Sequence, residues 1–90
     1  GRRAFFVPWE MIEMTLEIES FFGDCVLSGP ELSREALEGQ LDWAYEESGE
    51  SQDVFLELLE ERFGWKQTEM GAPSRYRYDL DVGKLFVVEN

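Results

Sequence analysis

The hydrophobic period of the chain changes near residue 64, from helical spacing to strict alternation. Up to that point apolar residues recur every three or four positions, whereas afterwards they alternate with polar residues in short runs. The pattern therefore predicts a helical part over residues 1–64 and a β part over residues 65–90. No repeat or long linker separates the two parts, so we expect a single domain over residues 1–90.

The first predicted helix covers residues 8–22. Proline is favoured at a first helical position, as at Pro8, and Gly23 supplies a stop signal. The expected core face consists of Met11, Met14, Ile18, Phe21 and Phe22. A strand is the alternative for residues 12–19, because apolar and polar residues alternate strictly there. We favour the helix, since Glu and Met are good helix formers and poor strand formers.

Residues 24–27 form a short extended connector to a second predicted helix, which ends near Glu47. The sequence Ser-Gly-Pro-Glu at residues 28–31 has the pattern of a capping box that opens this helix. The apolar face of the helix consists of Leu32, Ala36, Leu37, Leu41 and Ala44. Gly39 inside it costs about 1 kcal/mol relative to Ala, so a break into two short helices is the alternative.

Ser51 caps a third predicted helix over residues 52–63, and Gly64 ends it. Three strands are expected over residues 65–70, 75–80 and 84–88. Three helices followed by a C-terminal antiparallel β-hairpin or three-stranded meander make an α+β fold. This order of elements resembles that of a winged-helix domain, and the resemblance is one of architecture that covers most of the chain.

The charge of the chain indicates which class of partner it can bind. The chain carries 8 Lys+Arg against 20 Asp+Glu, for a net charge of −12. Residues 1–61 hold 16 acids and 3 bases, whereas residues 62–90 hold 4 acids and 5 bases. The acidity therefore belongs to the predicted helices. Such a surface repels nucleic-acid backbones and anionic membranes and attracts basic proteins.

The residue inventory restricts catalysis. The chain contains no His and a single Cys, Cys25, which excludes Ser-His-Asp, Cys-His and His-ligated zinc chemistry and leaves no intrachain disulfide. We expect a non-enzymatic protein without cofactor or metal. The enzymatic alternative would use paired carboxylates, such as Asp79 and Asp81, with a divalent metal. No apolar run approaches the roughly 20 residues of a membrane span, so we expect a cytoplasmic location and no membrane contact.

An acidic stripe is the most distinctive feature of the second predicted helix. It consists of Glu31, Glu35, Glu38, Asp42 and Glu46, spaced 4, 3, 4 and 4 residues apart. This spacing puts about one carboxylate on each 5.4 Å turn of one helix face. The simplest interpretation is a solvated face. The sharper interpretations are a docking surface for a basic protein, or a DNA mimic that imitates a phosphate backbone.

The aromatic residues add bulk that a core of this size is not expected to enclose wholly, and the alternative to an interface is a core thickened by an N-terminal arm. We expect Trp9, Trp43 and Trp65 to supply contact energy to a partner or to a second copy in a homodimer. The favoured function is therefore an acidic protein–protein interaction domain, a small regulator or inhibitor that binds a basic, nucleic-acid-binding protein. Its acidic stripe would steer the encounter.

The alternative function is nucleic-acid binding through the basic C-terminal strands, at Arg75, Arg77 and Lys84. In a strand, Arg75 and Arg77 share one face and Tyr76 and Tyr78 share the other. The alternation thereby separates phosphate-binding cations from stacking rings, which weakens this hypothesis. The third predicted helix exposes four carboxylates, those of Asp53, Glu57, Glu60 and Glu61, and the spacing of the first three repeats the acidic stripe. A winged-helix domain often inserts this helix into the major groove, where the carboxylates would repel phosphate, so a contact by the wing alone would remain.

Overall fold

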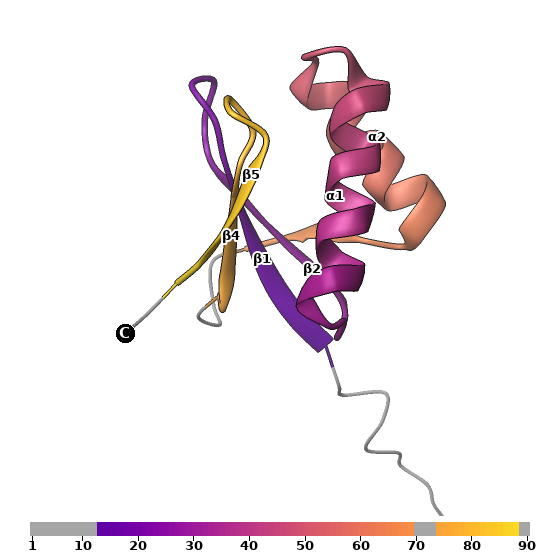
Figure 1. Ribbon diagram of the computed structural model, residues 1–90, viewed down its shortest axis with the longest axis vertical. Helices are drawn as coiled ribbons and strands as arrows, with labels where there is room; N and C mark the ends of the chain where they lie inside the picture. The colour runs from indigo at the N-terminus through magenta and orange to yellow at the C-terminus, as the bar shows by residue number, and fades with distance from the viewer. Residues whose placement is uncertain (1–12, 70–73, 89–90) are drawn as a thin grey trace, which may run out of the picture.

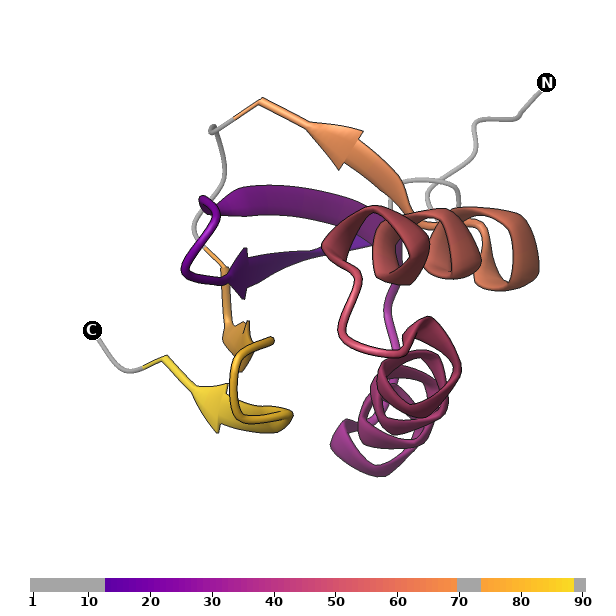
Figure 2. The ribbon, with the colours of Figure 1, turned by 90° about the horizontal axis from the view of Figure 1, so that it is seen from above.

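Two helices cover one face of a five-stranded mixed sheet in the computed structural model, which describes residues 13–69 and 74–88 (Figures 1 and 2). In chain order the elements are β1 (Glu13–Glu19), β2 (Cys25–Pro30), α1 (Arg34–Ser48), α2 (Gln52–Phe63), β3 (Lys66–Thr68), β4 (Tyr76–Asp79) and β5 (Lys84–Val87). Seen from above, α2 lies toward the β3 side of the sheet and α1 toward the β5 side (Figure 2).

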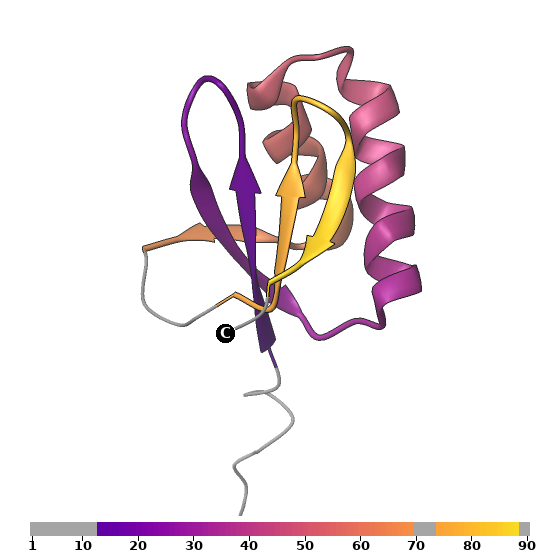
Figure 3. The same cartoon turned by 60° about the vertical axis from the view of Figure 1, so that its left-hand side comes forward.

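The sheet has the strand order β3-β2-β1-β4-β5. β1 pairs antiparallel with β2 and parallel with β4, so that Leu16 lies opposite both Leu27 and Tyr76. The β1–β2 hairpin and the β4–β5 hairpin thus lie side by side (Figure 3). β3 pairs with the outer side of β2 and not with β4. The predicted C-terminal meander is therefore wrong, although β4 and β5 do form an antiparallel hairpin.

The predicted first helix is also wrong, because residues 13–19 form the central strand β1. The alternating pattern was the correct signal: Met14, Leu16 and Ile18 are buried beneath the helices. Pairing with strands on both sides satisfies the backbone of β1, and this outweighs the helix propensity of its Glu residues. Phe21 and Phe22 are 85% and 79% exposed in the β1–β2 turn instead of in the core. Met11 and the rest of residues 8–12 lie outside the described residues.

The second predicted helix begins later than expected. Residues 25–30 form β2, and the Ser28 hydroxyl donates to the Glu13 carboxylate on β1 at 2.9 Å instead of capping a helix. The N-cap is Ser33, whose hydroxyl oxygen accepts the Ala36 N–H at 3.2 Å. Helix α1 then continues through Gly39 without a break. The described part of the chain consequently contains two helices, with strands before and after them, and the winged-helix order does not hold.

The third predicted helix is confirmed as α2, with the expected bounds. The Ser51 hydroxyl accepts the Val54 N–H at 3.3 Å, and Gly64 ends the helix in the left-handed region at φ 81°. Phe55 and Leu59 are the residues that it buries completely. The three C-terminal strands are likewise confirmed, and every bound lies within two residues of the expected one.

Trp65 closes the core where α1, α2 and the sheet meet. Its indole N–H donates to the Gln40 side-chain carbonyl at 2.9 Å, and the residue is only 1% exposed. Its ring lies directly on Gly29 of β2, so that a Cβ atom at position 29 would overlap the ring. The absence of a side chain at Gly29 is what lets the indole reach the sheet.

We predict that Gly29→Ala destabilises the protein by about 1–3 kcal/mol, because the methyl group must displace the Trp65 ring. Gly39→Ala is the matched control. A Cβ at Gly39 meets nothing within 4 Å, so this change should stabilise the protein by about 0.5–1 kcal/mol through helix propensity. Urea denaturation measures both changes. Equal midpoints for the two variants would contradict the Trp65–Gly29 contact.

Candidate functional site

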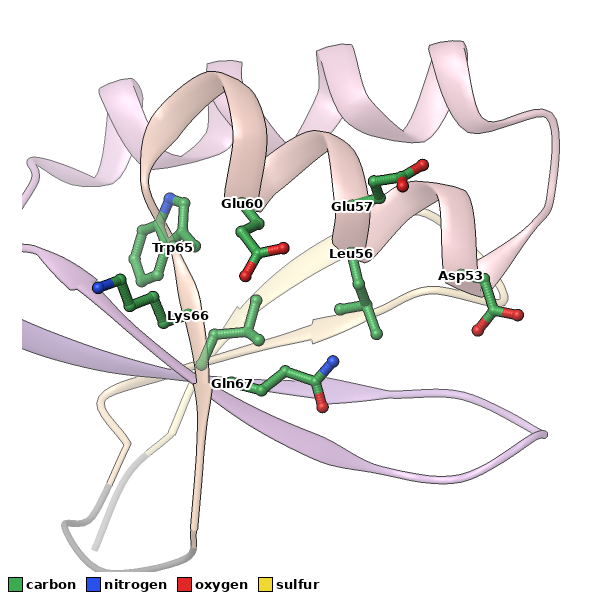
Figure 4. A pocket seen from close by; sticks show the side chains of 8 residues that line it. Asp53, Leu56, Glu57, Glu60, Trp65, Lys66 and Gln67 are labelled. Carbon is green, nitrogen blue, oxygen red and sulfur yellow. The ribbon is translucent and has the colours of Figure 1, made fainter.

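A groove of about 460 Å³ lies between α2 and the β3 edge of the sheet (Figure 4). Its lining consists of Leu27, Asp53, Leu56, Glu57, Glu60, Trp65, Lys66 and Gln67. The volume lies within the range of ligand sites in proteins, roughly 300–1,000 Å³. One wall comes from α2, and the floor and the other wall come from β2, β3 and the residues that lead into β3.

Three carboxylates line the α2 wall of the groove. Asp53, Glu57 and Glu60 follow one another at intervals of four and three residues, which places them on one flank of the helix. The helix has this flank because Phe55 and Leu59 turn its opposite side into the core. All three carboxylates are exposed. In Figure 4, the Asp53 and Glu60 carboxylates point from the helix toward the level of the sheet, whereas the Glu57 carboxylate stays level with the helix.

The floor of the groove is apolar. Leu27 faces the helices from β2, Leu56 reaches down from α2, and the Trp65 ring forms one end. Gln67 shares the helix-facing side of the sheet with Leu27, its partner in register. The Lys66 ammonium points away from the α2 carboxylates (Figure 4). The groove thus combines an apolar floor with a wall of three carboxylates and one cation at its rim.

This combination suits a long cationic side chain. The stem of Lys or Arg gains by covering apolar surface while its charged head stays at a polar rim. Within residues 13–69 and 74–88, the one ion pair is that of Arg77 with Glu19, on another part of the molecule. The three carboxylates of the groove are therefore available to an external cation.

The predicted acidic stripe does not reach this groove. Glu31 lies before the N-cap of α1 and so outside the helix, whereas Glu35, Glu38, Asp42 and Glu46 are exposed along it. The side of α1 that faces α2 carries Trp43 and Gln40 instead. The helical layer therefore carries two separate groups of carboxylates, one on α1 and one on the outer flank of α2.

The carboxylates of α1 affect the pKa of Tyr78, a buried residue of β4. Its ring is fully buried and stacks on Phe55 with 5.6 Å between ring centroids. Its hydroxyl has no hydrogen-bond partner among the described residues. Burial raises the pKa of Tyr78, and Asp42 is the largest charge that adds to the rise. The further contributions to the raised pKa come from Tyr45, Glu38 and Glu46. Three members of the stripe thus contribute to the raised pKa of Tyr78.

Two of the three Trp residues predicted to contact a partner, Trp43 and Trp65, pack inside the protein instead. Trp43 is half-buried between the helices, edge-on to Phe63 at 5.6 Å and covered by the Arg62 guanidinium at 5.2 Å. Trp65 is buried and presents one side to the groove. Trp9 lies outside the described residues. Trp43 and Trp65 therefore hold the two helices and the sheet together.

The predicted basic residues lie on the open face of the sheet, opposite the helices. Arg77 lies 3.4 Å from the Glu19 carboxylate and 5.1 Å above the centroid of the Phe86 ring. In register, Glu17 lies beside Arg77, and Asp79 lies opposite Lys84. Arg75 occupies the same face one step along β4, where it is exposed. Cations and carboxylates thus alternate across this face.

No protein-family model, curated protein or solved structure matches the chain.

Other candidate chemistry is confined to single residues. In the described part of the chain no three carboxylates or thiols converge closely enough to hold a metal ion. The Asp79 carboxylate accepts the Asp81 N–H at 3.0 Å, which is a turn contact. Cys25 is half-buried, and burial followed by the charge of Asp24 raises the pKa of its thiol. Neither described helix is long and apolar enough to cross a membrane.

The sequence signal for the groove was partial. The spacing of Asp53, Glu57 and Glu60 already placed them on one face of the third predicted helix. Leu27, Leu56 and Gln67 carried no such signal, because the pairing of β2 with β3 brings Leu27 and Gln67 together beneath α2.

We predict that Tyr78→Phe leaves stability at pH 7 unchanged or raises it by about 1 kcal/mol, because the variant lacks a buried, unpartnered hydroxyl. The raised pKa means that the folded protein holds this proton more tightly than the unfolded chain. Tyr78 therefore loses its contribution to stability as the pH rises above about 10, where the unfolded residue ionises.

Urea denaturation between pH 7 and 11 tests this: the variant should lose less stability above pH 10 than the native protein. Tyr76→Phe, at a half-buried residue of the same strand, is the control. A strong loss of stability at pH 7 for Tyr78→Phe alone would show that its hydroxyl has a partner.

Proposed function

We propose that this chain is a protein-interaction domain whose acidic helical layer binds a basic protein. The α2–β3 groove supports this proposal most directly. It offers an apolar floor to the stems of Lys or Arg side chains, and to their charges it offers three carboxylates that form no ion pair within residues 13–69 and 74–88. The activity is binding, and it calls for no residue with catalytic chemistry.

Charge over the helical layer supports the same class of partner. Residues 31–63 contain eleven carboxylates and two guanidinium groups, for a net charge of −9. A field of one sign raises the rate of encounter with an oppositely charged protein and is weakened by salt. The α1 carboxylates therefore steer the partner, and the groove carboxylates contact it.

The open face of the sheet is less suited to a polyanion. Arg75, Arg77 and Lys84 share it with Glu17, Glu19 and Asp79, so the cationic and anionic side chains cancel. Nucleic-acid binding depends on uncompensated cations that displace the counterions of phosphate. A basic protein at the helical layer is accordingly the stronger hypothesis.

The direct experiment is a ¹⁵N–¹H NMR titration with two short peptides. One peptide consists of Lys, Arg and Leu, and in the other Glu replaces each cation. The basic peptide should shift the signals of Leu27, Gln67 and the Trp65 indole N–H, with an affinity that falls as salt is added. Binding of both peptides, shifts confined to the open face, or tight binding of duplex DNA at physiological salt would overturn the proposal.

We predict that Asp53→Asn combined with Glu57→Gln and Glu60→Gln weakens binding of the basic peptide about tenfold. Three exposed charge contacts of about 0.5 kcal/mol each account for this loss. The matched control removes the same charge from α1, through Glu35→Gln, Glu38→Gln and Glu46→Gln. Stopped-flow kinetics should show faster dissociation for the groove variant and slower association, at low salt, for the α1 variant.

A further inference from the structure

The two edges of the sheet differ in chemistry. The β3 edge consists of Lys66, Gln67 and Thr68, all exposed and polar. The β5 edge begins with one exposed cation, Lys84, and is apolar over residues 85–87. Phe86 is 37% and Val87 47% exposed, and Val82 in the preceding turn is 57% exposed. Polar edge strands resist pairing with other chains, whereas an apolar stretch of exposed edge favours it. The β5 edge is therefore the one suited to a further strand.

The backbone groups that β5 leaves free can be assigned. The Val88 N–H donates to the Arg75 carbonyl at 2.9 Å, so residue 88 faces β4. On the other side of β4, the Leu80 N–H donates to the Glu19 carbonyl, which agrees with odd-numbered residues of β4 facing β5. Because hydrogen bonds alternate along an antiparallel pair, Leu85 and Val87 direct their N–H and C=O groups away from β4.

We propose that a second copy of this chain pairs antiparallel with β5, about a two-fold axis at Phe86. The free groups of Leu85 and Val87 lie symmetrically on either side of Phe86. In this register Leu85 exchanges two hydrogen bonds with Val87 of the second copy, and Val87 exchanges two with Leu85 of the second copy. The two five-stranded sheets then form one continuous sheet.

The register also brings the two Phe86 side chains together. Directly opposite residues in a non-hydrogen-bonded pair have Cα atoms about 4.5 Å apart, and aromatic pairs at such positions stabilise sheets. Phe86 lies on the open face with the Arg77 guanidinium over its ring. The pair at the two-fold axis is thus an aromatic contact flanked by one guanidinium from each copy.

Charge favours this edge for contact between identical chains. Residues 75–88 hold three cations and two carboxylates, whereas residues 31–63 hold two cations and eleven carboxylates. The β4–β5 hairpin therefore repels its own copy less than the helical layer does. In the paired sheet both α1 helices lie on the same face, so added salt should strengthen the dimer by screening their carboxylates. Binding of a basic partner at the opposite edge should instead weaken with salt.

A disulfide test reports on the register. Phe86→Cys in a Cys25→Ser background should form a covalent dimer under mild oxidation, because Cα atoms about 4.5 Å apart fit a disulfide. Lys84→Cys in the same background is the matched control. Its thiol would lie roughly 14 Å from its symmetry mate in this register, too far to cross-link. Equal cross-linking of the two variants would show random collision and overturn the proposal.

Sedimentation of the native sequence completes the test. The dimer fraction should rise with protein concentration. At fixed concentration it should also rise between 0.05 and 0.5 M NaCl, because the Debye length falls from roughly 14 Å to roughly 4 Å over this range. Val87→Pro removes an N–H that β4 does not use, so the variant should keep its fold by circular dichroism and sediment as a monomer. A native chain that stays monomeric at every concentration and salt would overturn the proposal and leave the groove hypothesis intact.

Discussion

The parallel pairing of β1 with β4 is the contact on which the rest of the molecule depends. It joins Leu16 to Tyr76, 60 residues apart in the chain, and makes one sheet from two hairpins. Both helices lie in the connection between these strands and pack on the same face of the sheet. That face gains the core, including Leu16, Ile18 and Tyr78, and the other face stays open. Loss of this pairing would separate the C-terminal hairpin from the helices.

The distribution of charge follows from this two-layer arrangement. The described residues contain 18 carboxylates and six cations, with a single ion pair on the open face. The outer surfaces of α1 and α2 therefore carry mutual repulsion, which Arg34 and Arg62 offset only in part. Like charges at helical spacing cost a few tenths of a kcal/mol each, and burial of the core offsets that cost. The fold thus tolerates an acidic surface, and such a surface is suited to a cationic partner.

Local signals predicted some elements well and failed at others for an identifiable reason. The prediction of helix α2 was correct because its signals, the caps at Ser51 and Gly64 and the helical apolar period, each act over a few neighbouring residues. The strand β1 was missed because its Glu residues favour a helix, while the pairing that overrides them comes from β2 and β4. Ser28 matched a capping box, yet Glu13 from β1 binds its hydroxyl. A contact 15 residues away cannot be seen in a four-residue motif.

The same division holds for the candidate site. The chain order of residues specifies the alternation in β1, the caps of α2, the acidity of the helices and the common flank of Asp53, Glu57 and Glu60. Long-range packing decides the rest. It determines that residues 13–19 form a strand, it sets the order of the strands, and it brings those carboxylates together with Leu27 and Trp65. Propensity and capping act over one helical turn, whereas strand pairing and core burial gain their free energy from residues far apart in the chain.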